Sequence, residues 1–377
     1  MSKNFSVDKF LNDSLNKKEK ENLLRNLRCE NNLIDFCSND YLGYARSDDL
    51  IKKFNEAKLF LNRIGSTGSR LISGNYKFTE ELEKYIAEFH GAEAGLIFNS
   101  GFDANLGLLS SIPQRGDTVI YDELSHASVR EGVRLSFANS YSFKHNDICD
   151  LQSKLEIAKG NIFVIVESVY SMNGDFALLE ETSVACNAYN ANLIVDEAHA
   201  TGVVGNKGEG LVKLLNLQGK TFARMHTFGK AIGSHGAIIL GSSLLRKYLL
   251  NFSHSFFYTT ALPLHSLVSV KLAYEKLSED VENINKLKEL INLFKSSAKE
   301  INSLELIKSE SAIQSVIIPG NDNVKKIAQH LQENGLDVRP ILSPTIPKGK
   351  ERLRIILHSF NKEEEVKKLI DVLKQKI

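Results

Sequence analysis

Three side chains that could do chemistry follow two apolar runs in the middle of the sequence. Asp196 and His199 come directly after the run Asn192–Val195, and Lys230 follows the run Met225–Phe228 inside a glycine-bounded turn. A buried acid is costly without a cationic partner, and desolvation makes a lysine amine neutral and nucleophilic. The three could hold a planar aromatic cofactor, with the carboxylate at a protonated ring nitrogen, the imidazole at a ring oxygen and the amine as nucleophile.

Two further segments could complete such a site. The run Ala94–Phe98 leads into Asn99-Ser100-Gly101-Phe102, a small-residue turn that could open a helix and bind an anion through backbone N–H groups. His126, in a loop after the run Thr118–Tyr121, could stack on a planar cofactor and relay protons. Each signal alone has a structural alternative: a turn, a loop histidine, a helix cap or buried ion pair for the acid, and a surface lysine.

The elements that must position these residues are short runs rich in Val and Ile, separated by longer amphipathic segments. Runs that are apolar on both faces are typical of buried, largely parallel strands linked by helices. Open sheets of this kind bind ligands at the C-terminal ends of their strands. The predicted strands are Ala94–Phe98, Thr118–Tyr121, Ile162–Val166, Asn192–Val195, Met225–Phe228 and Ala237–Leu240.

The remaining patterns predict helices around this sheet and a second, smaller domain. Residues 1–30 suit one or two polar amphipathic helices, and a helix with Thr79 as N-cap ends at Gly91. The predicted fold is α/β: a large domain with a mostly parallel sheet of the seven-stranded type at 46–272, after an N-terminal segment at 1–45, and a small α+β domain at 273–377. In that last domain we expect a helical stretch at 273–300, strands Ser315–Ile318, Val338–Ile341 and Arg352–Leu357, and helices Asn323–Asn334 and Lys362–Lys376.

Composition excludes several classes of partner. The chain has 377 residues, of which 42% are hydrophobic and 25% charged, and its net charge is +1, so neither nucleic acid nor an anionic membrane is expected. Its four cysteines are scattered, which argues against a metal site and a disulfide framework. Neither a secretory signal nor a run of 18 apolar residues is present, so we expect a cytoplasmic protein. P-loop, dinucleotide and nucleophile-elbow motifs are missing.

Taken in order along the chain, the candidate residues and the sequence motifs around them resemble the α-oxoamine synthases, a family of fold-type I enzymes that use pyridoxal 5'-phosphate. The resemblance covers the chain from Phe36 to the C-terminus. It is carried by FCSNDYLG at 36–43, GSTGSRLISGN at 65–75, FNSGFDAN at 98–105, DELSHAS at 122–128, ESVYSMNGD at 167–175, VDEAHATGVVGNKGEG at 195–210, TFGKAIGSHGA at 227–237 and YTTALP at 258–263.

The resemblance implies a role for each matching residue. Lys230 is expected to hold the cofactor as a Schiff base and to move the Cα proton, Asp196 to keep the pyridine nitrogen protonated, and His199 to bond the ring hydroxyl. Arg354 is expected to bind the amino-acid carboxylate, for which a planar fork is suited. The other expected contacts are His126 on the ring face, Gly101, Phe102, Ser171 and Thr227 at the cofactor, Thr260 at the phosphate of a partner subunit, and Thr345 near the substrate.

The implied reaction joins L-alanine to a pimeloyl thioester and releases carbon dioxide, a step of biotin biosynthesis. The implied partners are these small molecules, a second copy of the chain that shares the active site, and an acyl carrier that is coenzyme A or acyl carrier protein. A related enzyme that uses glycine or serine, and a silent cofactor-binding protein, are the alternatives. Arg25 or Arg28 is the candidate for the acyl end, and His235, where relatives usually have no histidine, either perturbs the lysine loop or faces solvent.

Overall fold

A computed structural model describes residues 7–27, 29, 32–58 and 63–376. The chain divides into two units, residues 1–33 and residues 34–377. In the first unit the amphipathic pattern forms helix α1 (Val7–Lys20), whose side chains are all exposed. The helix predicted within residues 1–30 is therefore present. In the described residues, helices are all too short or too polar to cross a membrane.

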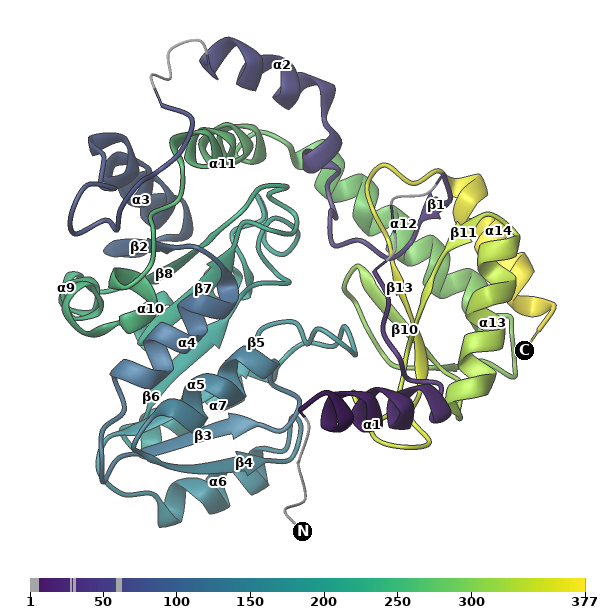
Figure 1. The fold of residues 1–377 in the computed structure, drawn as a ribbon, viewed down its shortest axis with the longest axis horizontal. Coiled ribbons are helices and arrows are strands. Elements are labelled where there is room, and N and C mark those ends of the chain that lie inside the picture. Colours follow the sequence, from purple (N-terminus) through teal and green to yellow (C-terminus); the bar gives the residue numbers. More distant parts are fainter. Residues whose placement is uncertain (1–6, 28, 30–31, 59–62, 377) are drawn as a thin grey trace. The chain divides into compact units, whose positions relative to one another are not determined.

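The centre of the second unit is a seven-stranded, mostly parallel sheet in the order β2-β8-β7-β6-β5-β3-β4, within the described residues (Figure 1). β8 is antiparallel to both β2 and β7, and the other neighbouring pairs are parallel. This confirms the predicted fold class. The strands are β2 (Ala94–Phe98), β3 (Thr118–Asp122), β4 (Asn139–Phe143), β5 (Ile162–Glu167), β6 (Asn192–Asp196), β7 (Ala223–Thr227) and β8 (Ala237–Gly241).

Helices cover both faces of this sheet because its strands carry apolar side chains on both. Leu96 and Phe98 of β2 pack in one core cluster with Leu108, whereas Ile97 belongs to the opposite cluster with Ile86. The helices of this part are α2 (Asp48–Ala57), α3 (Lys77–His90), α4 (Gly101–Ser111), α5 (Ala127–Leu135), α6 (Ile148–Ile157), α7 (Leu179–Ala188), α8 (Leu211–Leu214), α9 (Ser243–Phe252), α10 (His254–Phe257) and α11 (Leu264–Leu277), with 3-10 turns at Tyr44–Arg46 and Gln218–Lys220.

The C-terminal part is built on a smaller antiparallel sheet in the order β12-β13-β10-β9. The segment that begins with β1 (Ile34–Asp35) joins this part, since β1 pairs with β11 (Leu336–Asp337) and Ile356 N donates to Phe36 O at 2.9 Å. The boundaries at 45 and 272 stay predictions. The other elements are β9 (Glu305–Leu306), β10 (Ile313–Ile317), β12 (Arg339–Ile341), β13 (Arg352–Ile356), α12 (Val281–Lys299), α13 (Asn321–Glu333) and α14 (Glu363–Lys374).

The start of α3 corrects one prediction. Thr79 is not the N-cap, because the helix begins at Lys77 with Tyr76 in the capping position, and Thr79 is buried inside the first turn. Gly91 does end the helix, in the left-handed conformation (φ 66°) that glycine adopts without steric cost.

Helix α3 is fixed to β2 by the buried carboxylate of Glu83. Its Oε1 accepts from Ile97 N at 2.8 Å and pairs with Arg70, and its Oε2 accepts from Arg246 at 2.9 Å. We expect Glu83→Ala to lower the free energy of unfolding by ~3–5 kcal/mol, because it leaves two half-buried arginines and a buried backbone N–H without their partner. Glu81→Ala, at an exposed residue paired with Lys77, should change it by less than ~0.5 kcal/mol. Urea unfolding of both variants checks this expectation, and equal effects would contradict it.

Candidate active site

Three neighbouring strands bring polar side chains to one edge of the sheet. Glu167 ends β5, Asp196 ends β6, and the two are paired in register, while Asp196 is paired with Met225 of β7. Because these strands are parallel, their C-terminal ends meet at this edge. The loop after β7 adds Lys230, and the loop after β3 adds His126.

Asp196 is buried and held by neutral donors. Its Oδ1 accepts from Ala198 N at 2.9 Å, and its Oδ2 accepts from Asn105 Nδ2 at 2.8 Å. Asn105, on α4, also donates to Ser128 Oγ at 3.0 Å. The ammonium of Lys230 interacts electrostatically with Asp196, which raises the pKa of that amine. The carboxylate thus keeps a fixed orientation with its charge available to a second cationic group.

The turn that carries Lys230 is compact and rigid. Lys230 O accepts from Gly233 N at 2.8 Å, and Gly233 has φ 65°. A Cβ on Gly233 would lie 2.3 Å from Ala45 N, so only glycine fits there. Burial lowers the pKa of Lys230, Asp196 and Glu167 oppose this change, Arg354 adds to it, and the resulting pKa is about 8. The amine is therefore neutral more often than an ordinary lysine at pH 7. His235, in the same turn, is exposed and faces solvent.

His199 is held by a tyrosine from the N-terminal segment of the second unit. Tyr41 Oη lies 2.6 Å from Nδ1 of the buried His199 ring. Burial, with the charges of Lys230 and Arg354, keeps the pKa of His199 well below its ordinary value, so the ring is neutral. A neutral ring that accepts from Tyr41 at Nδ1 carries its proton on Nε2 and can donate it to an oxygen.

His126 caps helix α5 and remains accessible. Its Nδ1 accepts from Ser128 N at 3.2 Å, and its own backbone N donates to Glu167 Oε1 at 2.5 Å. Partial burial lowers the pKa of His126, against the raising effect of Asp196. A neutral, accessible imidazole oriented by its own helix can stack on a flat ligand.

Arg354 reaches this edge from the small sheet. Its Nε donates to Ser171 O at 2.7 Å, and one Nη donates to Asn39 Oδ1 at 3.1 Å. A guanidinium has five N–H donors, so others stay available to a carboxylate. Burial lowers the pKa of Arg354, but the group stays charged.

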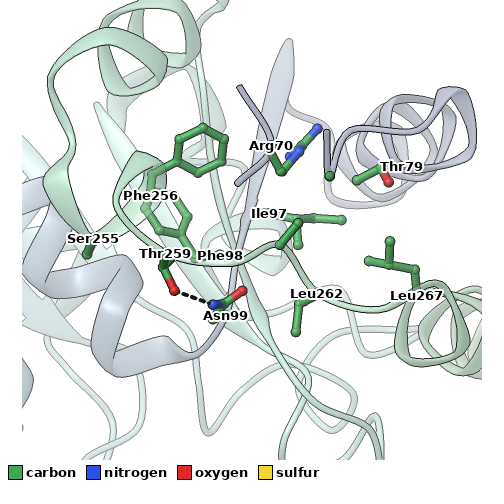
Figure 2. Close-up of a pocket in the computed structure, with 12 residues that line it drawn as sticks. Arg70, Thr79, Ile97, Phe98, Asn99, Ser255, Phe256, Thr259, Leu262 and Leu267 are labelled. Atoms are coloured by element: carbon green, nitrogen blue, oxygen red, sulfur yellow. Dashed lines mark hydrogen bonds between the residues drawn. The ribbon is translucent and has the colours of Figure 1, made fainter. Parts of the chain in front are cut away.

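The start of α4 lies beside the end of β7. A Cβ on Gly101 would lie 3.4 Å from the Met225 methyl group and 3.6 Å from Thr227 Cβ. Asp103 N already donates to Ser100 Oγ at 3.1 Å, and the first two N–H groups of the helix, together with the Thr227 hydroxyl, suit a phosphate. Figure 2 shows the neighbouring contact, in which Asn99 Nδ2 donates to Thr259 Oγ1 at 2.9 Å; the same group donates to Thr260 O at 2.9 Å.

The donor set fits pyridoxal phosphate. The buried carboxylate suits a protonated ring nitrogen, a partly neutral lysine suits the aldehyde, the neutral His199 suits the ring hydroxyl, and the helix start suits the phosphate.

Other predicted residues are exposed or lie outside the described residues. Thr345 is exposed in the loop between β12 and β13, and the Thr260 side chain is exposed. Arg25 is exposed in the first unit, and Arg28 lies outside the described residues. Their roles stay predictions.

The site also contains polar residues that sequence reasoning did not single out: Asn39, Tyr41, Asn105 and Glu167. Glu167 ends a predicted strand, so the strand-end rule could have found it. Burial and the charge of Asp196 together raise the pKa of Glu167 to about 8, against the lowering effect of Lys230. The other three act through contacts with residues far away in the chain, which spacing alone does not reveal.

Comparisons with known proteins agree with this geometry. The model of the family "Aminotransferase class I and II" matches residues 31–373. The chain is 42% identical over 363 residues to 8-amino-7-oxononanoate synthase of Emericella nidulans, covering 90% of this chain and 88% of that protein. It is 34% identical over 342 residues to the same enzyme of Marinobacter nauticus, covering 90% and 86%.

Solved structures give the same picture. The chain is similar to 8-amino-7-oxononanoate synthase of Francisella tularensis, with a TM-score of 0.80 and 27% identity over 92% of this chain and 98% of that one. It is also similar in fold to serine palmitoyltransferase of S. paucimobilis, with a TM-score of 0.90 and 24% identity over 98% of both chains.

Proposed function

Since the chain belongs to the class I and II aminotransferase family, we propose that it joins L-alanine to a pimeloyl thioester with loss of carbon dioxide, forming 8-amino-7-oxononanoate for biotin synthesis. One observation carries this proposal. The amine of Lys230 interacts electrostatically with both Asp196 and Arg354. An amino acid whose carboxylate binds Arg354 would then present its Cα to the amine that must take its proton.

Pyridoxal phosphate would be held by Lys230 at its aldehyde, Asp196 at the ring nitrogen, and His199 at the ring hydroxyl. His126 would cover a ring face, and Gly101, Phe102, Ser171 and Thr227 would complete the contacts. When bound, the cofactor supplies a protonated conjugated ring that withdraws electrons from the amino-acid Cα.

The side chains of this protein then divide the remaining work. Arg354 binds the carboxylate and orients the substrate, and Asn39 and Ser171 O hold the guanidinium in place. Lys230 would take the Cα proton at Nζ and return a proton after carbon dioxide leaves. His126, neutral and accessible, is the second group in reach for proton transfer.

The proposal includes a homodimer with a shared active site, in which Thr260 serves the partner's phosphate site. Large apolar side chains are exposed close to the α4 start, among them Phe102 (44%) and Tyr258 (80%). Leu71 and Ile72 are exposed in the adjacent glycine-rich loop, which is joined to the Thr260 segment by Ala261 N donating to Gly68 O at 3.0 Å. A second copy would cover this apolar surface. A cytoplasmic location and the choice between coenzyme A and acyl carrier protein belong to the same proposal.

Product identification tests this function. Purified protein loaded with pyridoxal phosphate is given L-alanine with pimeloyl-coenzyme A or pimeloyl-acyl carrier protein, and the expected product is 8-amino-7-oxononanoate with one carbon dioxide. Carbon dioxide from glycine or serine but not from alanine would instead indicate a related enzyme, such as 2-amino-3-ketobutyrate coenzyme A ligase or serine palmitoyltransferase. Cofactor binding without turnover of any amino acid would indicate a silent protein.

Arg354→Lys should weaken amino-acid binding selectively. Lysine keeps the positive charge but loses the planar fork, so we expect KM for alanine to rise ~10- to 100-fold, with KM for the thioester little changed. The matched control is Arg134→Lys on the exposed face of α5, which should change neither value. Equal increases in both KM values would contradict a role in carboxylate binding.

A further inference from the structure

His145 lies between two carboxylates next to the site and has no role in the proposed reaction. It follows β4, and its Nδ1 is 3.1 Å from both side-chain oxygens of Asp122. Its Nε2 is 2.6 Å from Oδ2 of Asp175. Asp122 is fully buried, and His145 is half-buried. A ring with an acceptor at each nitrogen satisfies both contacts only when both nitrogens carry protons.

The surroundings favour this charged form. Burial disfavours the charge on His145, but hydrogen bonds to Asp122 and Asp175 outweigh it and raise its pKa to about 9. Glu123 Oε1 accepts from the His145 backbone N at 3.1 Å, and the Tyr170 ring meets the imidazole edge-on with centroids 4.4 Å apart. The cation that faces Asp175 from the small sheet is Arg352.

The two carboxylates belong to two different loops of the site. Asp122 ends β3 and begins the turn to His126, where its Oδ1 accepts from Leu124 N at 2.8 Å. Asp175 closes a hairpin, in which its O accepts from Tyr170 N at 3.0 Å and Val169 is bridged to Phe176. The His145 ring therefore joins the loop of His126 to this hairpin.

The same hairpin holds both arginines of β13. Ser171 O accepts from Arg354 Nε at 2.7 Å, and Asn173 Oδ1 accepts from Arg352 at 2.5 Å. Met172 O accepts from Ser315 Oγ of β10 at 2.8 Å. The position of the hairpin thus sets the direction of the Arg354 fork.

We infer that His145 is a positioning residue for recognition of the substrate's α-carboxylate: its imidazolium ties Asp122 to Asp175 and so fixes the hairpin that orients Arg354. The inference rests on the proposed function only in that Arg354 binds the carboxylate. His145 and Arg354 lie far apart in the sequence, and the inference requires no direct contact between them. His145 acts on Arg354 through the hairpin.

The test measures amino-acid binding by cofactor absorbance in wild type and His145→Gln. Glutamine is neutral and cannot bridge both carboxylates with two charged donors, so Kd for alanine should rise roughly 3- to 30-fold at pH 7. Cofactor retention and kcat should change little. His330→Gln, at a half-buried histidine of α13, is the matched control and should match wild type.

The pH dependence separates positioning from general damage. The raised pKa of His145 means that its charge, and the order it gives, is fully present below about pH 6.5 and is lost as the pH passes through about 9. The ratio of the His145→Gln Kd to the wild-type Kd should therefore fall toward one above pH 9. Taking the ratio removes the titration of alanine itself, which both proteins share.

Three results would overturn the inference: an unchanged Kd, a ratio that is constant with pH, or a loss of cofactor retention that accounts for the whole effect. If His145→Gln does not fold, Asp175→Asn removes the other end of the same bridge. It must give the same increase in Kd at pH 7 and the same fall of the Kd ratio toward one above pH 9. Failure of the proposed function gives a different result from failure of this inference. If alanine gives no product, the binding test is done with whichever of glycine and serine binds, since all three share the carboxylate.

Discussion

Lys230→Ala is expected to lower turnover of alanine and pimeloyl thioester by ~10²- to 10⁴-fold, the range associated with loss of a positioned proton-transfer group. The reason is local. Burial lowers the pKa of Lys230 to about 8, so about half of the amine is neutral at that pH, and only the neutral form can attack the cofactor aldehyde or take a proton. Alanine at position 230 removes that amine and leaves the turn geometry intact.

The two measurements are the rate of turnover and the site at which the cofactor is attached. Borohydride reduction followed by peptide mass spectrometry should find the cofactor fixed to the Lys230 peptide in wild type and to none in the variant. Lys220→Ala, at an exposed lysine of the 3-10 turn before β7, is the control and should behave as wild type in both assays. A Lys230→Ala protein that still turns over at the wild-type rate would refute the assignment of this lysine.

The strands that carry the site could be read from the sequence because their apolar runs are buried on both faces. β2 has the predicted bounds, and β3, β5, β6 and β8 each extend one residue further. β7 lies earlier than predicted, at Ala223–Thr227, since the buried polar Arg224 interrupts the apolar pattern at the start of the strand. Arg224 is accommodated by donating to His90 O at 2.9 Å, a contact that the pattern does not contain.

The one strand of the large sheet that went unpredicted is an exposed edge strand. β4 has the sequence NSYSF, and four of its five residues are exposed. Because β4 is so exposed, it lacks the apolar signal that marks the others, which include β2 at the opposite edge of the sheet. The loop that follows it carries His145, whose importance depends on two carboxylates brought together from β3 and the hairpin. Sequence order does not encode that convergence.

The residues of the candidate site also differ in whether the sequence predicts their position. Asp196 and Lys230 follow apolar runs, so their place at the sheet edge could be predicted. Tyr41 and Asn39 could not, because they follow β1, which pairs with β11 in a separate two-stranded sheet, and they contact His199 and Arg354 only in the folded chain. The N-terminal segment thus completes the site from a distance of more than 150 residues along the chain, since the Tyr41–His199 separation is 158.

The second large effect is expected for Asp196→Asn, which should lower kcat by ~10²- to 10³-fold, as loss of a preorganised electrostatic group does elsewhere. The substitution preserves size and keeps an oxygen that can accept from Ala198 N. It removes the negative charge that would keep a ring nitrogen protonated, and with it the electron withdrawal on which Cα deprotonation depends. Asp371→Asn, at an exposed residue of α14, is the control and should have wild-type kcat.

A second readout of Asp196→Asn does not depend on turnover. In the wild type the Asp196 charge raises the pKa of Lys230 and that of His126. Its removal should therefore shift both pKa values downward, so that a pH titration of chemical labelling at Lys230 in the cofactor-free protein moves to lower pH. Asp196→Glu keeps the charge and should keep the titration near its wild-type position even if the longer side chain lowers kcat. If Asp196→Asn left both the titration and kcat unchanged, the carboxylate would have no electrostatic role, and the convergence of residues 196 and 230 would be structural only.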